Sequence, residues 1–176
     1  MTIAARLVWL LVIATGLAAV FFWVADQRGG SSSRVPMVAS LLTVALALLS
    51  VGLISHTVAR HTVQILPVVL ALGLSVRKSR YADAAAVAVF LFWLLIMAGI
   101  WLFLLGIASI FSGRFSPAEV VLTLIIGCAC IAGLFASAHR SHAPVVTSAL
   151  VFLCFSIVQL FAMWSTYSVY WPRSLR

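Results

Sequence analysis

The sequence predicts an all-α fold, a polytopic bundle of transmembrane helices that forms a single integral membrane domain over residues 1–176. The first observation is composition: 65% of the residues are hydrophobic and 8% are charged, whereas soluble domains are about half apolar and about a quarter charged. The second is charge spacing, because five stretches between charged residues contain 19 to 32 uncharged residues. About 20 apolar residues in a helix cross a hydrocarbon core of about 30 Å.

The long stretches are expected to be helices because a backbone exposed to lipid must satisfy its own hydrogen bonds, and they lack the alternation of barrel strands. The first predicted span covers residues 7–25. It exceeds the usual length of a signal-peptide core, and Trp23 would occupy a position before the cleavage site that favours small residues. We therefore expect it to be retained. A polar loop follows at 26–34, and Pro36 opens the second span, 36–56.

Residues 62–76 allow two interpretations. Only 16 uncharged residues separate Arg60 from Arg77, and they include Pro67. A re-entrant or interfacial helix would fit this length, and so would a sixth span whose terminal arginines reach the interface. The basic residues divide six against five between the two faces in both cases. The amino-terminal charge then favours five full spans with the N-terminus inside.

Three further spans are predicted at 83–113, 117–138 and 144–170. The pattern Ser-Pro-Ala-Glu at 116–119 is typical of a capping box that starts a helix. The turns at 77–80 and 139–142 are cytoplasmic in both interpretations. Arginine greatly outnumbers lysine and alanine is abundant, which favours a bacterial protein of the inner membrane.

Composition and motifs argue against several functions. The net charge of +8 is dispersed over short loops and termini, so no nucleic-acid surface is expected. The three cysteines lie inside hydrophobic stretches, where a disulfide framework is not expected, and Cys128 and Cys130 point to nearly opposite sides of a helix. There is no nucleophile, phosphate-loop or dinucleotide motif. No catalytic residue, resident cofactor or metal is predicted.

The three carboxylates are all expected near span ends. Asp26 falls in a loop, Asp83 opens a helix beside a basic turn, and Glu119 belongs to the predicted capping box. Proton pumps and many transporters require an ionisable group within the membrane. The sequence places no carboxylate at that depth.

The histidines are the candidate cofactor ligands: His56, His61, His139 and His142. If residues 62–76 do not cross, all four gather at the cytoplasmic face, where they could bind haem or a transition metal. Polar residues at the water-facing ends of spans are the commoner explanation, and no haem or zinc motif supports a site.

Gln159 is the most polar residue deep within a span. A buried amide in lipid seeks a partner on another helix, so Gln159 is predicted to make an interhelical contact or to line a pore. Small residues also recur at helical spacing and predict two packing seams: Gly99, Gly106 and Gly113 in one span, and Ala129, Gly133 and Ser137 in the next.

Three functional hypotheses follow. The chain is expected to be a non-catalytic accessory or structural subunit of a larger membrane complex, because it combines packing seams with a lack of catalytic groups. One alternative is a small oligomeric transporter or channel in which Gln159 lines the path. The other is a haem- or metal-binding redox protein that uses the four histidines. The expected partners are the lipid bilayer and other membrane subunits or further copies of the chain.

Overall fold

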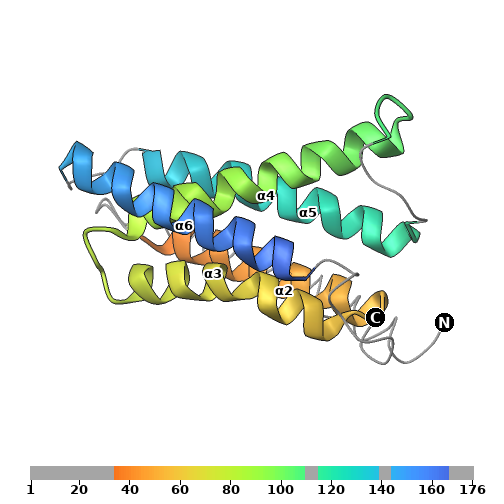
Figure 1. Ribbon diagram of the computed structural model, residues 1–176, viewed down its shortest axis with the longest axis horizontal. Helices are drawn as coiled ribbons and strands as arrows, with labels where there is room; N and C mark the ends of the chain where they lie inside the picture. Colours follow the sequence, from red (N-terminus) through yellow and green to blue (C-terminus); the bar gives the residue numbers. More distant parts are fainter. Residues whose placement is uncertain (1–33, 110–114, 139–143, 167–176) are drawn as a thin grey trace.

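A computed structural model describes residues 34–109, 115–138 and 144–166 (Figure 1). These residues form five helices: α2 (Val35–Ile54), α3 (Val58–Val76), α4 (Ala82–Leu104), α5 (Pro117–Ala138) and α6 (Val145–Ser165). All five are long and apolar enough to cross a membrane. The predicted all-α transmembrane architecture is therefore confirmed, while the first predicted span, 7–25, lies outside the described residues.

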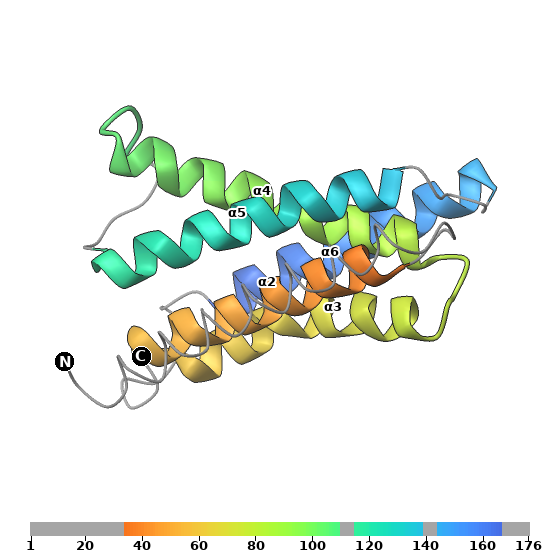
Figure 2. The same ribbon diagram turned by 180° about the vertical axis from the view of Figure 1, so that it is seen from behind.

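Successive helices run in opposite directions, so the bundle has two ends (Figures 1 and 2). The Arg77 end contains the start of α2, the turn between α3 and α4, the end of α5 and the start of α6. The His56 end contains the turn between α2 and α3 and the opposite ends of α4, α5 and α6. A hydrogen bond of 2.9 Å from Arg34 Nη1 to the carbonyl of Ser79 joins two segments at the Arg77 end.

Each helix packs against at least two others. α2 lies between α3 and α5, α4 contacts α3, α5 and α6, and α6 packs on α3 and α4 (Figures 1 and 2). The largest fully buried side chains include Phe90, Met37, Leu41 and Leu122, which come from α2, α4 and α5. These three helices therefore supply most of the core.

The uncertain segment 62–76 belongs to a full-length helix. α3 begins at Val58 and has 19 residues, which corresponds to about 28 Å of helix. Pro67 lies inside α3 without ending it. Of the two interpretations, the spanning one fits this helix by length and composition.

The span predicted at 83–113 is too long, because α4 ends at Leu104. Gly106 adopts a φ of +71°. Its N–H donates to the carbonyl of Phe103 and the N–H of Ile107 donates to the carbonyl of Leu102, both at 2.9 Å. This is a Schellman motif with glycine in the left-handed position. Charge spacing missed it because the residues after the stop are also apolar.

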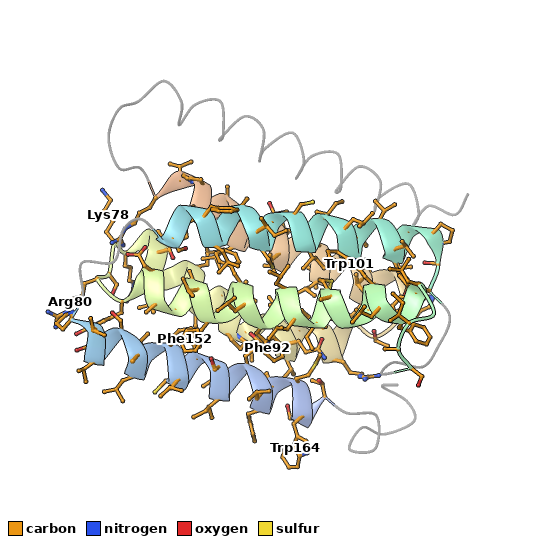
Figure 3. All side chains as sticks on the ribbon, turned by 90° about the horizontal axis from the view of Figure 1, so that it is seen from above. Lys78, Arg80, Phe92, Trp101, Phe152 and Trp164 are labelled. Carbon is orange, nitrogen blue, oxygen red and sulfur yellow. The ribbon has the colours of Figure 1, made fainter. Side chains whose placement is uncertain are left out.

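The polarity of α6 is the reverse of that of a helix in a water-soluble protein. Its buried residues are Gln159 and Ala162. Large apolar side chains point outward instead: Leu153 is 54% exposed, Ile157 64% and Phe161 62%. Trp164 also projects away from the bundle (Figure 3). A helix in lipid is expected to direct its amide side chain toward the other helices and its aliphatic side chains toward the hydrocarbon. α6 therefore provides independent support for a multi-pass membrane protein.

Candidate functional site

A buried polar cluster joins α3 to α6. We call it the Gln cluster and define it as Gln64, Gln159, Met163 and Thr166. The Nε2 group of Gln159 donates to the backbone carbonyl of Gln64 at 3.2 Å. The Nε2 group of Gln64 donates to Thr166 Oγ1 at 2.8 Å and approaches Met163 Sδ at 3.2 Å. Gln159 therefore makes the predicted interhelical contact, through a hydrogen bond to α3.

A proline lies in the turn of α3 that contains this backbone acceptor. Pro67 has no N–H, so it cannot donate to the carbonyl of Val63 four residues earlier, and its ring crowds that turn. Gln159 reaches the next carbonyl, that of Gln64, in the same turn. In lipid, a side chain from a neighbouring helix commonly satisfies backbone groups near a proline. α6 thus attaches to α3 beside its proline-containing turn.

The side-chain oxygen of Gln159 has no hydrogen-bond partner among the described residues. The amide orientation follows from its surroundings, because only the Nε2 group can donate to the Gln64 carbonyl. The residue is 0% exposed. Its Oε1 atom is consequently a buried acceptor directed into the bundle.

Arg60 completes the connection at the His56 end. Its Nε group donates to the carbonyl of Thr166, immediately after α6, at 2.9 Å. A guanidinium group at this position satisfies a terminal carbonyl and complements the helix dipole. The Gln cluster itself contains amides, a hydroxyl and a thioether. None of these groups titrates near neutral pH, so the cluster can hold helices together or bind a donor but cannot act as a general acid or base.

The two described histidines, His56 and His61, both lie at the His56 end of the bundle. His56 is exposed, has a φ of +56° and ends α2, where the N–H of Thr57 donates to the carbonyl of Gly52 at 2.8 Å. His61 is partly buried, and its Nδ1 lies 3.1 Å from both Thr57 Oγ1 and the Thr57 carbonyl. The His61 side chain therefore has a local structural role, whereas at His56 it is the backbone conformation that ends α2.

His139 and His142 lie outside the described residues. The gathering of all four histidines at one face was expected only if residues 62–76 do not cross, and it stays a prediction. Among the described residues, no three histidine, cysteine or acidic side chains form a group that could hold a metal ion.

The two described carboxylates lie at helix starts, as predicted. The N–H of Ser116 donates to Glu119 Oε2 at 2.7 Å, and the N–H of Glu119 donates to Ser116 Oγ at 3.3 Å. These reciprocal bonds form the predicted capping box of α5. Asp83 is buried in the first turn of α4.

The predicted seam in α5 is partly realised. A Cβ atom at Gly133 would lie 2.2 Å from Phe90 Cζ, so only glycine permits the ring of α4 to pack there. Ser137 is buried one turn later. Ala129 belongs instead to a pocket that faces α2.

Of the predicted seam in α4, Gly106 is not a packing contact. Gly106 follows the helix end, with nothing within 4 Å of an added Cβ, so it serves as a helix stop instead of a packing site. Gly99 lies within α4 and is partly buried, while Gly113 is outside the described residues. The spacing of glycines within one predicted helix does not show whether a glycine ends the helix or packs against another helix.

Sequence reasoning missed a second glycine contact. A Cβ atom at Gly127 would lie 2.3 Å from Trp101 Cη2, and Trp101 Nε1 donates to Thr123 Oγ1 at 3.1 Å. Gly127 and Gly133 are six residues apart, which places them about 120° apart around a helix. No helical repeat links them, so spacing alone offered no signal.

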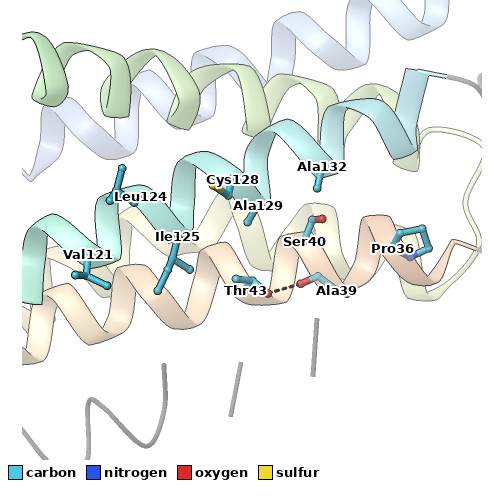
Figure 4. Close-up of a pocket in the computed structure, with 10 residues that line it drawn as sticks. All are labelled: Pro36, Ala39, Ser40, Thr43, Val121, Leu124, Ile125, Cys128, Ala129 and Ala132. Atoms are coloured by element: carbon cyan, nitrogen blue, oxygen red, sulfur yellow. Dashed lines mark hydrogen bonds between the residues drawn. The ribbon is translucent and has the colours of Figure 1, made fainter. Parts of the chain in front are cut away.

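A second feature is an apolar pocket of about 400 Å³ between α2 and α5 (Figure 4). Its α2 wall consists of Pro36, Ala39, Ser40 and Thr43. Its α5 wall consists of Val121, Leu124, Ile125, Cys128, Ala129 and Ala132. The hydroxyl of Thr43 already donates to the carbonyl of Ala39 at 2.9 Å, so the pocket presents mainly apolar surface.

No protein family matches the chain, and neither a curated protein nor a solved structure is similar to it. Its class therefore follows from its own geometry. The five apolar helices and the outward apolar face of α6 define a multi-pass helical membrane protein.

Proposed function

We propose that the protein is a non-catalytic accessory or structural subunit of a larger membrane complex. The observation that carries this proposal is the placement of polar groups. Among the described residues, the ionisable groups of lysine, arginine, histidine and the carboxylates lie in turns or in the first turn or so of a helix. Gln64 and Gln159, which lie deeper, join two helices of the same chain.

This distribution of polar groups favours a role in packing against other membrane components over a catalytic role. A polar group within a bilayer is costly and usually reports function. Here the deeper polar groups hold α6 against α3, and the outward faces of the helices are apolar. A protein of this kind acts through the lipids or subunits that its helices contact.

Mild extraction from native membranes tests the proposal. The chain at its native abundance should co-purify with unrelated membrane subunits at a fixed ratio, and short-range cross-linking before extraction should give the same partners. The variant Lys78→Arg is the matched control for amine cross-linking, because Lys78 is the only lysine in the chain. A chain that is recovered alone, without cross-linked partners, would contradict the proposal.

A second candidate is a small oligomeric transporter or channel. The Oε1 atom of Gln159 favours it, because this fully buried acceptor has no partner within the described ranges and could contact water or a substrate donor. Flux through reconstituted liposomes that is lost in Gln159→Leu but kept in Gln64→Leu would support this candidate. Absence of flux in a correctly folded homo-oligomer would exclude it.

We also propose that the protein lies in a bacterial inner membrane with its Arg77 end in the cytoplasm. Four described basic residues lie at the Arg77 end, namely Arg34, Arg77, Lys78 and Arg80, against Arg60 at the other end. Short loops rich in lysine and arginine remain cytoplasmic. The turns at 77–80 and 139–142 would then both be cytoplasmic. Labelling of Lys78→Cys only from the cytoplasmic side would agree, and labelling only from outside would reverse the orientation.

A further inference from the structure

The pocket between α2 and α5 has the character of a helix-packing site. Its walls are formed largely by small side chains, including Ala39, Ser40, Ala129 and Ala132 (Figure 4). Small residues on two neighbouring helices leave a hollow that a third backbone can approach closely. The apolar lining supplies no charged group that would select a polar ligand.

We infer that this pocket is the docking site for residues 7–25 of the same chain, packed as a helix antiparallel to α2. These 19 uncharged residues would form a helix of about 28 Å, nearly the length of α2. The segment is covalently tethered to the pocket, so its effective concentration there exceeds that of any free partner. This inference is independent of the proposed function.

The tether determines the direction of packing. Residues 26–34 connect the segment to α2, and Arg34 is held at the Arg77 end by its bond to Ser79. The pocket begins at Pro36, at the same end. Nine residues span at most about 30 Å, which suffices to turn the chain beside α2. The inferred packing therefore requires residue 25 to be at the Arg77 end and the segment to run away from that end along α2.

In this packing, small residues of the segment 7–25 lie beside small residues of the pocket. Cys128 lies ten residues before the end of α5, about 15 Å from the Arg77 end. Ten residues before Ala25 is Thr15, within the sequence Ala-Thr-Gly-Leu-Ala-Ala at 14–19. Five of these six residues are small. In the inferred packing they lie level with the part of the pocket where both walls are formed by small side chains. Close contact of three helices is favoured there.

Disulfide formation from the native Cys128 tests the inference in the full chain in membranes. Cys130 and Cys154 are replaced by serine, and single cysteines are introduced at positions 11–19. A disulfide requires Cα atoms about 4.4–6.8 Å apart. Intramolecular bonds should form near position 15 and recur at three- or four-residue spacing, with weak or no bonding between these positions.

The matched control retains Cys154 in place of Cys128. Cys154 is exposed on α6, which packs on α3 and α4. The same introduced cysteines should not bond to it. Failure of Cys128 to bond at any position, or equal bonding to Cys154, would overturn the inference. Bonds between two chains would assign the pocket to a second copy and overturn it as well.

Alkylation of the unsubstituted chain provides a second measurement that does not depend on a folded variant. Cys128 and Cys154 are both exposed when only the described residues are considered. With a small lipid-soluble maleimide, Cys128 should react about ten-fold more slowly than Cys154, because the packed helix must open first. Equal rates would show that mobile lipid fills the pocket and would contradict the inference.

Discussion

Replacement of Gly133 by alanine tests the packing of α4 against α5. An added Cβ atom would lie 2.2, 2.3 and 2.7 Å from three ring carbons of Phe90. Phe90 is 0% exposed, so its ring cannot move into open space. Overpacking of this kind costs about 1–3 kcal/mol, whereas glycine to alanine in a helix interior gains about 0.5–1 kcal/mol. We expect Gly133→Ala to lower stability by about 1–2 kcal/mol in balance.

Gly73 provides the matched control. It lies within α3, and an added Cβ atom would have nothing within 4 Å. Gly73→Ala therefore gains only the helix-propensity contribution and should stabilise the protein by about 0.5–1 kcal/mol. The two variants make the same chemical change, so a difference between them reports the contact with Phe90.

Reversible unfolding in mixed micelles, followed by circular dichroism, measures both variants. A double-mutant cycle with Phe90→Leu identifies the cause: if the ring causes the strain, the pair should couple by about 0.5–3 kcal/mol. Equal stabilities of Gly133→Ala and Gly73→Ala would refute the packing argument. Additive effects of Gly133→Ala and Phe90→Leu would refute the assignment to that ring.

Three further predictions concern single groups and use the same unfolding assay. Gln64→Leu removes the donor to Thr166 and should lower stability by about 1 kcal/mol or less. Ser116→Ala removes one half of the capping box and should cost about 1 kcal/mol, because the N–H of Glu119 loses its acceptor. His56→Gly should stabilise the protein by up to about 1 kcal/mol, because a left-handed residue with a Cβ is strained. His56→Val should destabilise it, since branching at Cβ worsens the same strain.

Each of these predictions has its own control. Thr62 is exposed on α3 and bonds only within its helix, so Thr62→Val should have less effect than Gln64→Leu, and an equal loss would contradict the Gln cluster. Glu119→Gln keeps a side-chain acceptor and should resemble the parent protein. A large loss in His56→Gly would show that the imidazole has a role beyond ending α2.

Charge spacing predicted the helices because the cost of placing ions in lipid is large and depends mainly on sequence. It could not locate helix ends that depend on backbone conformation. His56, Lys78 and Gly106 all adopt positive φ after a helix, yet only glycine signals this conformation in a sequence. The start of α3 at Val58 was missed for this reason, whereas the end of α4 at Leu104 was missed because the residues after Gly106 are also apolar.

Only one of the two glutamines of the candidate site could be predicted from the sequence. The depth of Gln159 identified it as a polar group in need of a partner. Its partner, Gln64, lies in the segment 62–76, whose crossing the sequence left open. The two residues are 95 positions apart in sequence, and their pairing depends on the packing of α6 against the proline-containing turn of α3. Side-chain pairing across helices is a property of the assembled bundle.

Side-specific labelling at the two ends of α3 tests most directly whether the described bundle spans the membrane. His56 and Lys78 are both exposed and occupy equivalent turns, so His56→Cys and Lys78→Cys in a cysteine-free background form a matched pair. With a membrane-impermeant maleimide on sealed vesicles, the two positions should react from opposite sides. Reaction of both positions from the same side would contradict the crossing of α3 and the arrangement of the bundle across the bilayer.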